Sequence, residues 1–326
     1  MGHPYFQKIF ASPRTWLPQA VLGTTFFFSA FLVVEISPAF FFLAILPMIL
    51  SPIFLVLTTW RYGNPLGVAV AALSAGFILL LFNLPVLLIF VTQFAVVGIL
   101  LGDGLRKKIP AMGLLYSTSL VSTLLIIAAG AVYLSYSGMD FSALLAKGSE
   151  SLRLAAQENA RRFQLTPEQK MQYEQGLKGM IAFVKVAYPA LIFMNAFSIV
   201  CLNLLVPLHL AGYLGLDRSH VPPLEELTIP FGWVWGLILS GMLYLLKIPY
   251  LKWVGLNIAL IFLLAYLIQG YGILTFFLQR TRLPRIVKGV IYIIFLLQPT
   301  LILLLCGAGL FETWFHFRQR AAAKEK

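Results

Sequence analysis

The sequence has few charged residues and almost no cysteine. Asp, Glu, Lys and Arg make up 11% of the 326 residues, hydrophobic residues make up 60%, and the mean hydropathy is +0.88. This composition cannot cover a large soluble domain with polar surface, so it excludes a large soluble enzyme. The two cysteines, Cys201 and Cys306, each lie inside an apolar stretch without CxxC spacing. The sequence therefore predicts neither a disulfide framework nor a zinc site.

Signatures of common catalytic sites are also missing. The chain has no Walker A loop, no HExxH pair and no GxSxG sequence around a serine. Its four histidines are scattered along the chain without the spacing of metal ligands. We therefore predict no cofactor and no metal site, and no motif supports an enzymatic activity.

Long apolar stretches fill most of the chain. They cover residues 16–34, 38–60, 66–82, 85–101, 112–136, a sixth that ends near Leu208, then 229–246, 253–278 and 290–311. A bilayer core of about 30 Å needs about 20 apolar residues of helix, and backbone polar groups in lipid must be bonded internally. We predict an all-α, polytopic transmembrane helical bundle of about nine segments, with eight to ten as the range.

The polar residues divide the chain into four parts. Residues 1–138 hold the first five transmembrane segments, 139–180 form an extramembrane helical hairpin, 181–311 hold four C-terminal segments, and 312–326 form a basic polar tail. In the hairpin, Thr166, Pro167 and Gln169 provide an N-cap, a first-turn proline and a capping-box partner. The helix that starts there is predicted to continue unbroken into the sixth span.

Charge indicates how the chain is oriented. The net charge is +12, but the basic residues form short clusters at the ends of apolar stretches, which favours membrane orientation over nucleic-acid binding. Lys8 and Arg14 precede the first span, and Arg106, Lys107 and Lys108 follow the fourth. We predict a bacterial plasma (inner) membrane protein, in contact with the lipid bilayer, whose N-terminus is cytoplasmic.

The C-terminus does not fit this orientation. Nine crossings from a cytoplasmic start place the tail outside, yet it carries Arg318, Arg320, Lys324 and Lys326. One stretch is therefore predicted to be re-entrant, and the second and ninth are candidates because both contain prolines in mid-span.

Polar side chains at membrane depth are the candidate substrate-binding groups, because they are costly to place there. Glu35 ends the first span and Lys185 opens the sixth, so the two could pair or bind a zwitterionic solute; alternatively, each reaches the interface on its own. Gln93 and Asn195 are the other candidates. Further intramembrane amides are interpreted as hydrogen-bonding links between helices: Asn203, Asn257, Gln269 and Gln298.

Two kinds of feature predict contacts between helices or proteins. Gly98 with Gly102, and Gly232 with Gly236, have the GxxxG spacing of close helix pairs. The turn 106–108 and the terminal residues Trp314 and Arg318 are the candidate partner contacts.

Two passages resemble the substrate-binding S components of energy-coupling-factor vitamin transporters. They are residues 46–67, with their proline- and glycine-marked turns, and residues 97–102 leading into the basic turn 106–108. The resemblance implies an S-component-like core of six helices plus extra C-terminal helices, with energy-coupling transporter subunits as partners. S components present a pair of small residues to these subunits on their first helix, and Ala20 and Thr24 have that spacing here.

A second resemblance covers nearly the whole chain. Residues 203–205, the loop 223–230 and the terminal run 309–318, in which Glu312 and His316 flank Trp314, are similar to the YybS-like family of bacterial membrane proteins. That family has no characterised activity, so this resemblance implies a bacterial integral membrane protein only.

Two functions follow from these observations. The leading hypothesis is a small-solute binding or transport protein whose first six spans enclose a pocket open toward the hairpin 139–180. The alternative is a non-transporting scaffold or partner protein of the cell envelope, which contacts envelope-assembly proteins. A transporter should need Glu35, Lys185 or Asn195, whereas a scaffold should tolerate their replacement.

Overall fold

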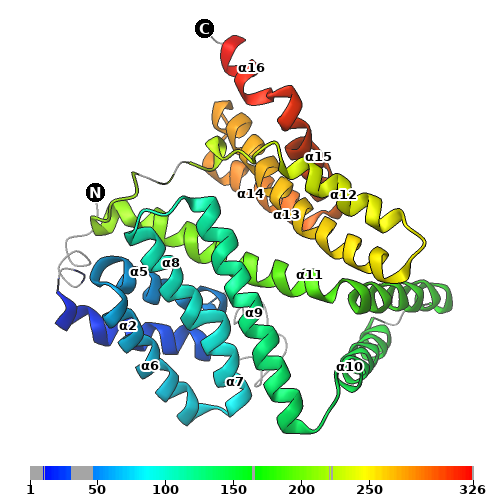
Figure 1. The fold of residues 1–326 in the computed structure, drawn as a ribbon, viewed down its shortest axis with the longest axis horizontal. Helices are drawn as coiled ribbons and strands as arrows, with labels where there is room; N and C mark the ends of the chain where they lie inside the picture. The colour runs from blue at the N-terminus through cyan, green and yellow to red at the C-terminus, as the bar shows by residue number, and fades with distance from the viewer. Residues whose placement is uncertain are drawn as a thin grey trace. The chain divides into compact units, whose positions relative to one another are not determined.

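The computed structural model describes residues 10, 12–30, 47–163, 166–219, 221 and 223–324. These residues form helices, turns and irregular segments and contain no strand, which confirms the all-α class. The elements are α2 (Pro13–Ser29), α5 (Pro52–Tyr62), α6 (Asn64–Leu81), α7 (Leu84–Ile89), the π-helix η2 (Phe90–Ala95), α8 (Val96–Arg106), α9 (Ala111–Ser137), α10 (Phe141–Arg162), α11 (Pro167–Leu214), the 3₁₀ turn η3 (Leu224–Glu226), α12 (Trp233–Leu245), α13 (Pro249–Arg280), α14 (Arg285–Leu297), α15 (Pro299–Phe315) and α16 (Phe317–Lys324) (Figure 1).

Five of the described helical runs are long and apolar enough to cross a bilayer. They are α6, the continuous run Leu84–Arg106, α9, α11 and α13, and the count is six if α14 and α15 form one bent span. The other predicted stretches differ in instructive ways. The first two run into residues 31–46, which lie outside the described residues, the seventh is the 13-residue α12, and the ninth bends by 96° between α14 and α15. The polytopic helical class therefore holds.

Helix α11 has 48 residues, and its N-terminus forms as its sequence predicts. The Thr166 hydroxyl accepts a hydrogen bond from the Gln169 N–H at 3.3 Å, and the Gln169 side chain accepts one from the Thr166 N–H at 3.0 Å. This capping box satisfies two backbone donors that a helix start otherwise leaves open. The helix ends at Gly215, whose φ of 68° is readily adopted by glycine. The predicted unbroken helix from the hairpin into the sixth span is confirmed.

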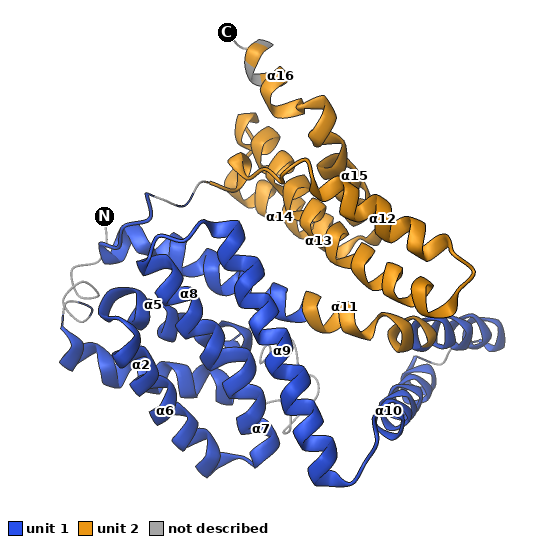
Figure 2. Ribbon diagram, viewed as in Figure 1, with its two compact units in different colours: residues 1–181, 195–221 blue, residues 182–194, 222–326 orange. Residues whose placement is uncertain are grey.

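The chain divides into two compact units (Figure 2). Unit 1 comprises Met1–Ile181 and Asn195–Val221, and unit 2 comprises Ala182–Met194 and Pro222–Lys326. Helix α11 thus contributes residues to both units.

Unit 1 is packed around aromatic rings and a close helix pair. Phe28 on α2 meets Phe90 and Phe94 edge-on, with ring centroids 5.1 and 5.3 Å apart. A Cβ atom on Gly98 would lie 2.5 Å from the Leu55 Cβ, and one on Gly102 would lie 2.6 Å from the Val56 carbonyl oxygen. Helices α5 and α8 therefore approach closely because both positions are glycine, as the first GxxxG pair predicts.

Unit 2 is built on α13, which contacts α12 on one side and α15 on another. Of the second GxxxG pair, only Gly236 makes a close contact, with the Phe262 ring, while Gly232 faces open space. On the other side, a Cβ atom on Gly309 would lie 2.0 Å from the Tyr266 carbonyl oxygen. The α13–α15 pair thus depends on a glycine outside any GxxxG motif.

Asn203, Asn257 and Gln269 link helices, as predicted, whereas Gln298 is exposed between α14 and α15. Asn203 donates to the Ile49 carbonyl at 2.7 Å within unit 1. Within unit 2, Asn257 on α13 accepts from the Ala190 N–H at 2.9 Å and donates to the Val186 carbonyl at 3.0 Å, both on α11. Such bonds contribute roughly 0.6 to 2 kcal/mol each in membrane proteins.

We expect Gly309→Leu to separate α15 from α13, because the new side chain meets backbone atoms that cannot move aside. Overpacking of this kind should lower the free energy of unfolding by about 3 kcal/mol, measured by thermal or denaturant unfolding in detergent. Gly307→Leu is the matched control, because nothing lies within 4 Å of its Cβ position. Equal stabilities of the two variants would contradict the close α13–α15 contact.

Candidate functional site

An irregular segment, residues 223–232, lies along the C-terminal half of α13. It contains η3 followed by non-helical residues up to the start of α12. A Cβ atom on Gly272 would lie 2.7 Å from the Leu224 carbonyl oxygen, so the segment touches the α13 backbone at this glycine. Farther along, Gln279 donates to the Glu225 carboxylate at 2.9 Å. We call this stretch the 223–232 segment.

Side chains from other elements satisfy the backbone of the 223–232 segment. The side-chain amide oxygen of Gln269 accepts the Ile229 N–H at 2.7 Å, and the Arg318 guanidinium donates to the backbone carbonyls of Leu227, at 3.0 Å, and of Glu225. A buried backbone N–H or C=O group without a partner costs free energy comparable to a lost hydrogen bond. Gln269 and Arg318 therefore make this irregular segment possible beside an apolar helix.

Gln269 also connects α13 to α15. Its side-chain amide donates to the Gly309 carbonyl at 2.9 Å, and only 2% of the residue is exposed. The Gln269 side chain thus uses both its oxygen and its NH₂ group, and it joins α13, α15 and the 223–232 segment.

A buried ion pair anchors the C-terminal run. Glu312 accepts from Arg318 Nε at 2.8 Å, and each side chain is only 7% exposed. The same carboxylate accepts the Phe317 N–H at 2.7 Å, so it also satisfies the N-terminus of α16. Between the two, His316 has φ 48° and ψ 51°, and its N–H caps α15 by donating to the Glu312 carbonyl at 3.0 Å. Residues 312–318 therefore form a tight corner, in which the chain turns at His316 from α15 into α16.

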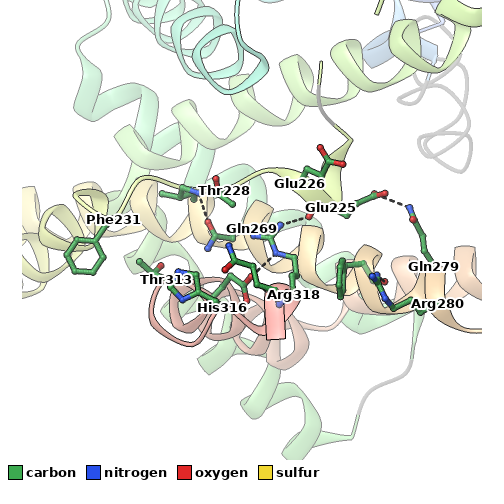
Figure 3. Close-up of a pocket in the computed structure, with 14 residues that line it drawn as sticks. Glu225, Glu226, Thr228, Phe231, Gln269, Gln279, Arg280, Thr313, His316 and Arg318 are labelled. Atoms are coloured by element: carbon green, nitrogen blue, oxygen red, sulfur yellow. Dashed lines mark hydrogen bonds and ion pairs between the residues drawn. The ribbon is translucent and has the colours of Figure 1, made fainter. Parts of the chain in front are cut away.

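These elements line an open cavity of about 660 Å³ (Figure 3). Its walls come from the 223–232 segment, from the end of α13 and from the corner after α15. The lining residues are Glu225, Glu226, Thr228, Ile229, Phe231, Gln269, Phe276, Gln279, Arg280, Glu312, Thr313, His316, Arg318 and Gln319. The volume lies within the range of small-molecule sites, of about 300 to 1,000 Å³.

The cavity offers both signs of charge and two aromatic rings. Arg280 lies over the Phe276 ring with its guanidinium carbon 3.5 Å from the ring centroid, and Glu226 contributes a carboxylate to the lining from the 223–232 segment. The Thr313 hydroxyl oxygen is buried and has no hydrogen-bond partner among the described residues. Such a lining suits a small polar solute that carries an acidic and a basic group.

The structure describes three of the four predicted substrate-binding residues. Glu35 lies outside the described residues, so its pairing with Lys185 stays a prediction. Lys185 and Asn195 are both exposed on α11. Gln93 is only 6% exposed, lies in the π-helix η2, and its side-chain oxygen has no hydrogen-bond partner among the described residues. Since π-helical turns are frequent at functional sites, Gln93 is a second candidate, located in unit 1.

The basic turn 106–108 is partly engaged within unit 1. Lys107 contacts Asp103 at 2.6 Å and Lys108 contacts Asp217 at 2.9 Å. Hydrogen bonds from Ser219, together with the Lys108 ammonium, hold the pKa of Asp217 well below its ordinary value. Because both pairs are exposed, they add little stability and leave the turn accessible to a partner. Arg106 is also exposed and covers Gly63.

The two terminal candidates differ in exposure. Trp314 is 45% exposed, with its ring 6.4 Å from the Phe231 ring. Arg318, in contrast, is 6% exposed and its guanidinium is used within unit 2. Trp314 is therefore the terminal candidate that offers surface to a partner.

The cavity itself was not anticipated from the sequence. The sequence pattern predicts Gln269 only as a link between helices, and it singles out none of Glu225, Glu226, Gln279 and Arg280 as a site residue. The sequence does contain one signal for this site, since Gln269 lies within the apolar stretch 253–278 and Gln279 and Arg280 follow directly after it.

We expect Glu312→Ala to destabilise unit 2, because it leaves Arg318 buried without its partner charge. Breaking a buried pair in this way costs about 3 to 5 kcal/mol, which unfolding in detergent should detect. The variant should also release α16 to trypsin. Arg320→Ala is the control, since Arg320 is exposed and its loss should cost no more than about 0.5 kcal/mol. If the two variants prove equally stable and equally resistant, the buried corner does not exist in the native protein.

Comparison with models of known protein families gives a match over most of the chain. Residues 26–313 match the family model described as predicted membrane protein (DUF2232). No curated protein and no solved structure is significantly similar to the chain. The matched range covers most of the chain, including the 223–232 segment, α13 and Glu312. The chain belongs to the DUF2232 family of predicted membrane proteins.

Proposed function

We propose that this membrane protein binds a small polar solute in the cavity at the end of α13. The observation that carries the proposal is the cavity itself, with charged groups of both signs around about 660 Å³. Neither Glu226 nor Arg280, which both line the cavity, takes part in the buried Glu312–Arg318 ion pair. Glu226 and Arg280 are the groups proposed to bind the charged ends of the solute.

The proposal also includes the membrane in which the protein lies and its orientation in that membrane. The basic groups that follow α13 are Arg280, Arg282, Arg285 and Lys288, and basic residues are enriched on the cytoplasmic side of bacterial plasma membranes. With the N-terminus in the cytoplasm, the cavity lies at the cytoplasmic face. A transport role remains part of the hypothesis through the resemblance to S components.

One observation limits that resemblance. Ala20 and Thr24, the small pair that would face a coupling subunit, are both fully buried within unit 1. If energy-coupling subunits are partners of this chain, they therefore contact another surface, such as the exposed turn 106–108. Gln93 in unit 1 supports a ligand in the S-component-like region, but the cavity of unit 2 is the stronger site.

A stability screen tests the proposal directly. A ligand at 100 times its dissociation constant should stabilise the purified protein by about 2.7 kcal/mol, visible as a raised melting temperature across a panel of amino acids and vitamins. Arg280→Gln should abolish the shift. Arg282→Gln, which is exposed and outside the cavity lining, should retain it. A panel without any stabilising member, or an equal shift in both variants, would argue against this site.

The alternative, a scaffold or partner protein of the cell envelope, rests on exposed apolar surface near the C-terminus. Trp314 and Phe311 are 45% and 51% exposed, and a shallow groove on α15 runs between Thr300 and Phe311. Part of this surface will face lipid, but Trp314 stands next to the basic α16, where a protein partner could bind.

The tail must be shortened without disturbing the buried corner. We expect deletion of residues 320–326 combined with Trp314→Ala to abolish recovery of envelope-assembly proteins, or of transporter coupling subunits, in detergent extracts. Unfolding temperature is the control, because the variant keeps Glu312 and Arg318. Unchanged recovery from the deleted form would exclude this version of the alternative.

A further inference from the structure

Helix α15 runs in the same direction as α13. Near its middle, Cys306 Sγ lies 3.5 Å from the Leu263 carbonyl oxygen, and the Gly309 carbonyl accepts from Gln269. Farther along, Thr313 and His316 line the same cavity as Phe276, Gln279 and Arg280. Later residues of α15 therefore lie beside later residues of α13, so the helices are parallel. The C-terminal ends of both helices line the same cavity.

Parallel neighbours require the chain to turn back between them. Only α14 and two short links separate α13 from α15. The first turn of α14 remains at the end of α13, because Lys288 Nζ donates to the Thr281 carbonyl at 3.1 Å. Thirteen residues of helix extend about 20 Å, whereas a bilayer core is about 30 Å thick. Helix α14 is thus too short to cross, and the chain turns by 96° between α14 and α15.

Surface and charge agree with a segment that dips into lipid. Helix α14 is apolar and contains no buried residue. Arg282 and Arg285 stand at its entrance, and Arg318 and Arg320 follow its exit through α15. Positive residues are preferred on the cytoplasmic side of the membrane. This preference is obeyed if the clusters before α14 and after α15 lie on the same side of the membrane, and it is violated if they lie on opposite sides.

We propose that residues 285–315 form a re-entrant hairpin, which enters and leaves the bilayer at the face where α13 ends. Its apex, Gln298, remains within the membrane, and α16 with its basic residues returns to the cytoplasm. The hairpin removes the ninth crossing, so the basic residues at the end of α13 and those of α16 lie on one side of the membrane, the side where basic residues are enriched.

The hairpin also determines how the cavity is reached. Since the corner at Glu312 to Arg318 forms one wall and returns to the cytoplasmic face, the cavity opens on that side. Under the proposed function, on which this step rests, the solute would be bound from the cytoplasm.

Cysteine labelling tests the hairpin independently of any ligand. In a background with Cys201 and Cys306 replaced by alanine, single cysteines are introduced as Arg282→Cys, Gln298→Cys and Ala323→Cys. A membrane-impermeant maleimide is applied to intact spheroplasts and to inside-out vesicles. Glu150→Cys, in the predicted external hairpin, is the control for the opposite face.

We expect Arg282→Cys and Ala323→Cys to react only in inside-out vesicles, and Gln298→Cys to be unreactive in spheroplasts. Reaction of all three after denaturation shows that each thiol is present. Labelling of positions 282 and 323 from opposite faces would overturn the hairpin, and so would labelling of position 298 in spheroplasts. A failed ligand screen together with the expected labelling would remove the proposed function and leave the hairpin intact.

Discussion

The arrangement of unit 2 depends on how the backbone of the 223–232 segment is satisfied. In lipid, an irregular segment is stable only if its N–H and C=O groups find partners in the protein. Here the partners are two side chains from distant parts of the chain, Gln269 in the middle of α13 and Arg318 after α15. Without them the segment could not lie beside α13, the cavity would lose one wall, and α12 would have no fixed starting point.

This constraint also changes how the C-terminus is understood. Its sequence is basic and is predicted to be a polar tail, yet Glu312 and Arg318 within it are buried in unit 2. Glu312 is needed to neutralise Arg318, and Arg318 is needed to bind the carbonyls of Glu225 and Leu227. Unit 1 is held differently, by close glycine contacts and by aromatic rings such as Phe28. The polar chemistry beyond simple helix links is therefore concentrated in unit 2, together with Gln93 of unit 1 as a separate case.

The sequence predicted the features that are decided locally. Helix α11 starts at a capping box because Thr166 and Gln169 have the required spacing, and Asn203 and Asn257 link helices because an amide in lipid must find a partner. The corner could not be predicted in this way. Glu312 and Arg318 are six residues apart, which places them on no common helix face, and they meet only because His316 adopts a left-handed conformation. The cavity was missed for a related reason, since the sequence does not distinguish a charge at a helix end that faces water from one that faces another part of the chain.

Proline shows most clearly why pattern alone does not fix topology. Pro189 lies within the continuous helix α11, whereas Pro299 begins a new helix after a 96° bend. The proline ring removes a donor and disturbs the preceding turn in both cases. Beside Pro189, Asn257 binds the Ala190 N–H and the Val186 carbonyl, so a neighbouring helix supplies partners and α11 continues. Before Pro299, Gln298 is extended and exposed, and α14 has no buried residue through which a neighbour could support it. Whether a proline bends a membrane helix enough to reverse its course thus depends on what packs against it, and the sequence around the proline does not contain that information.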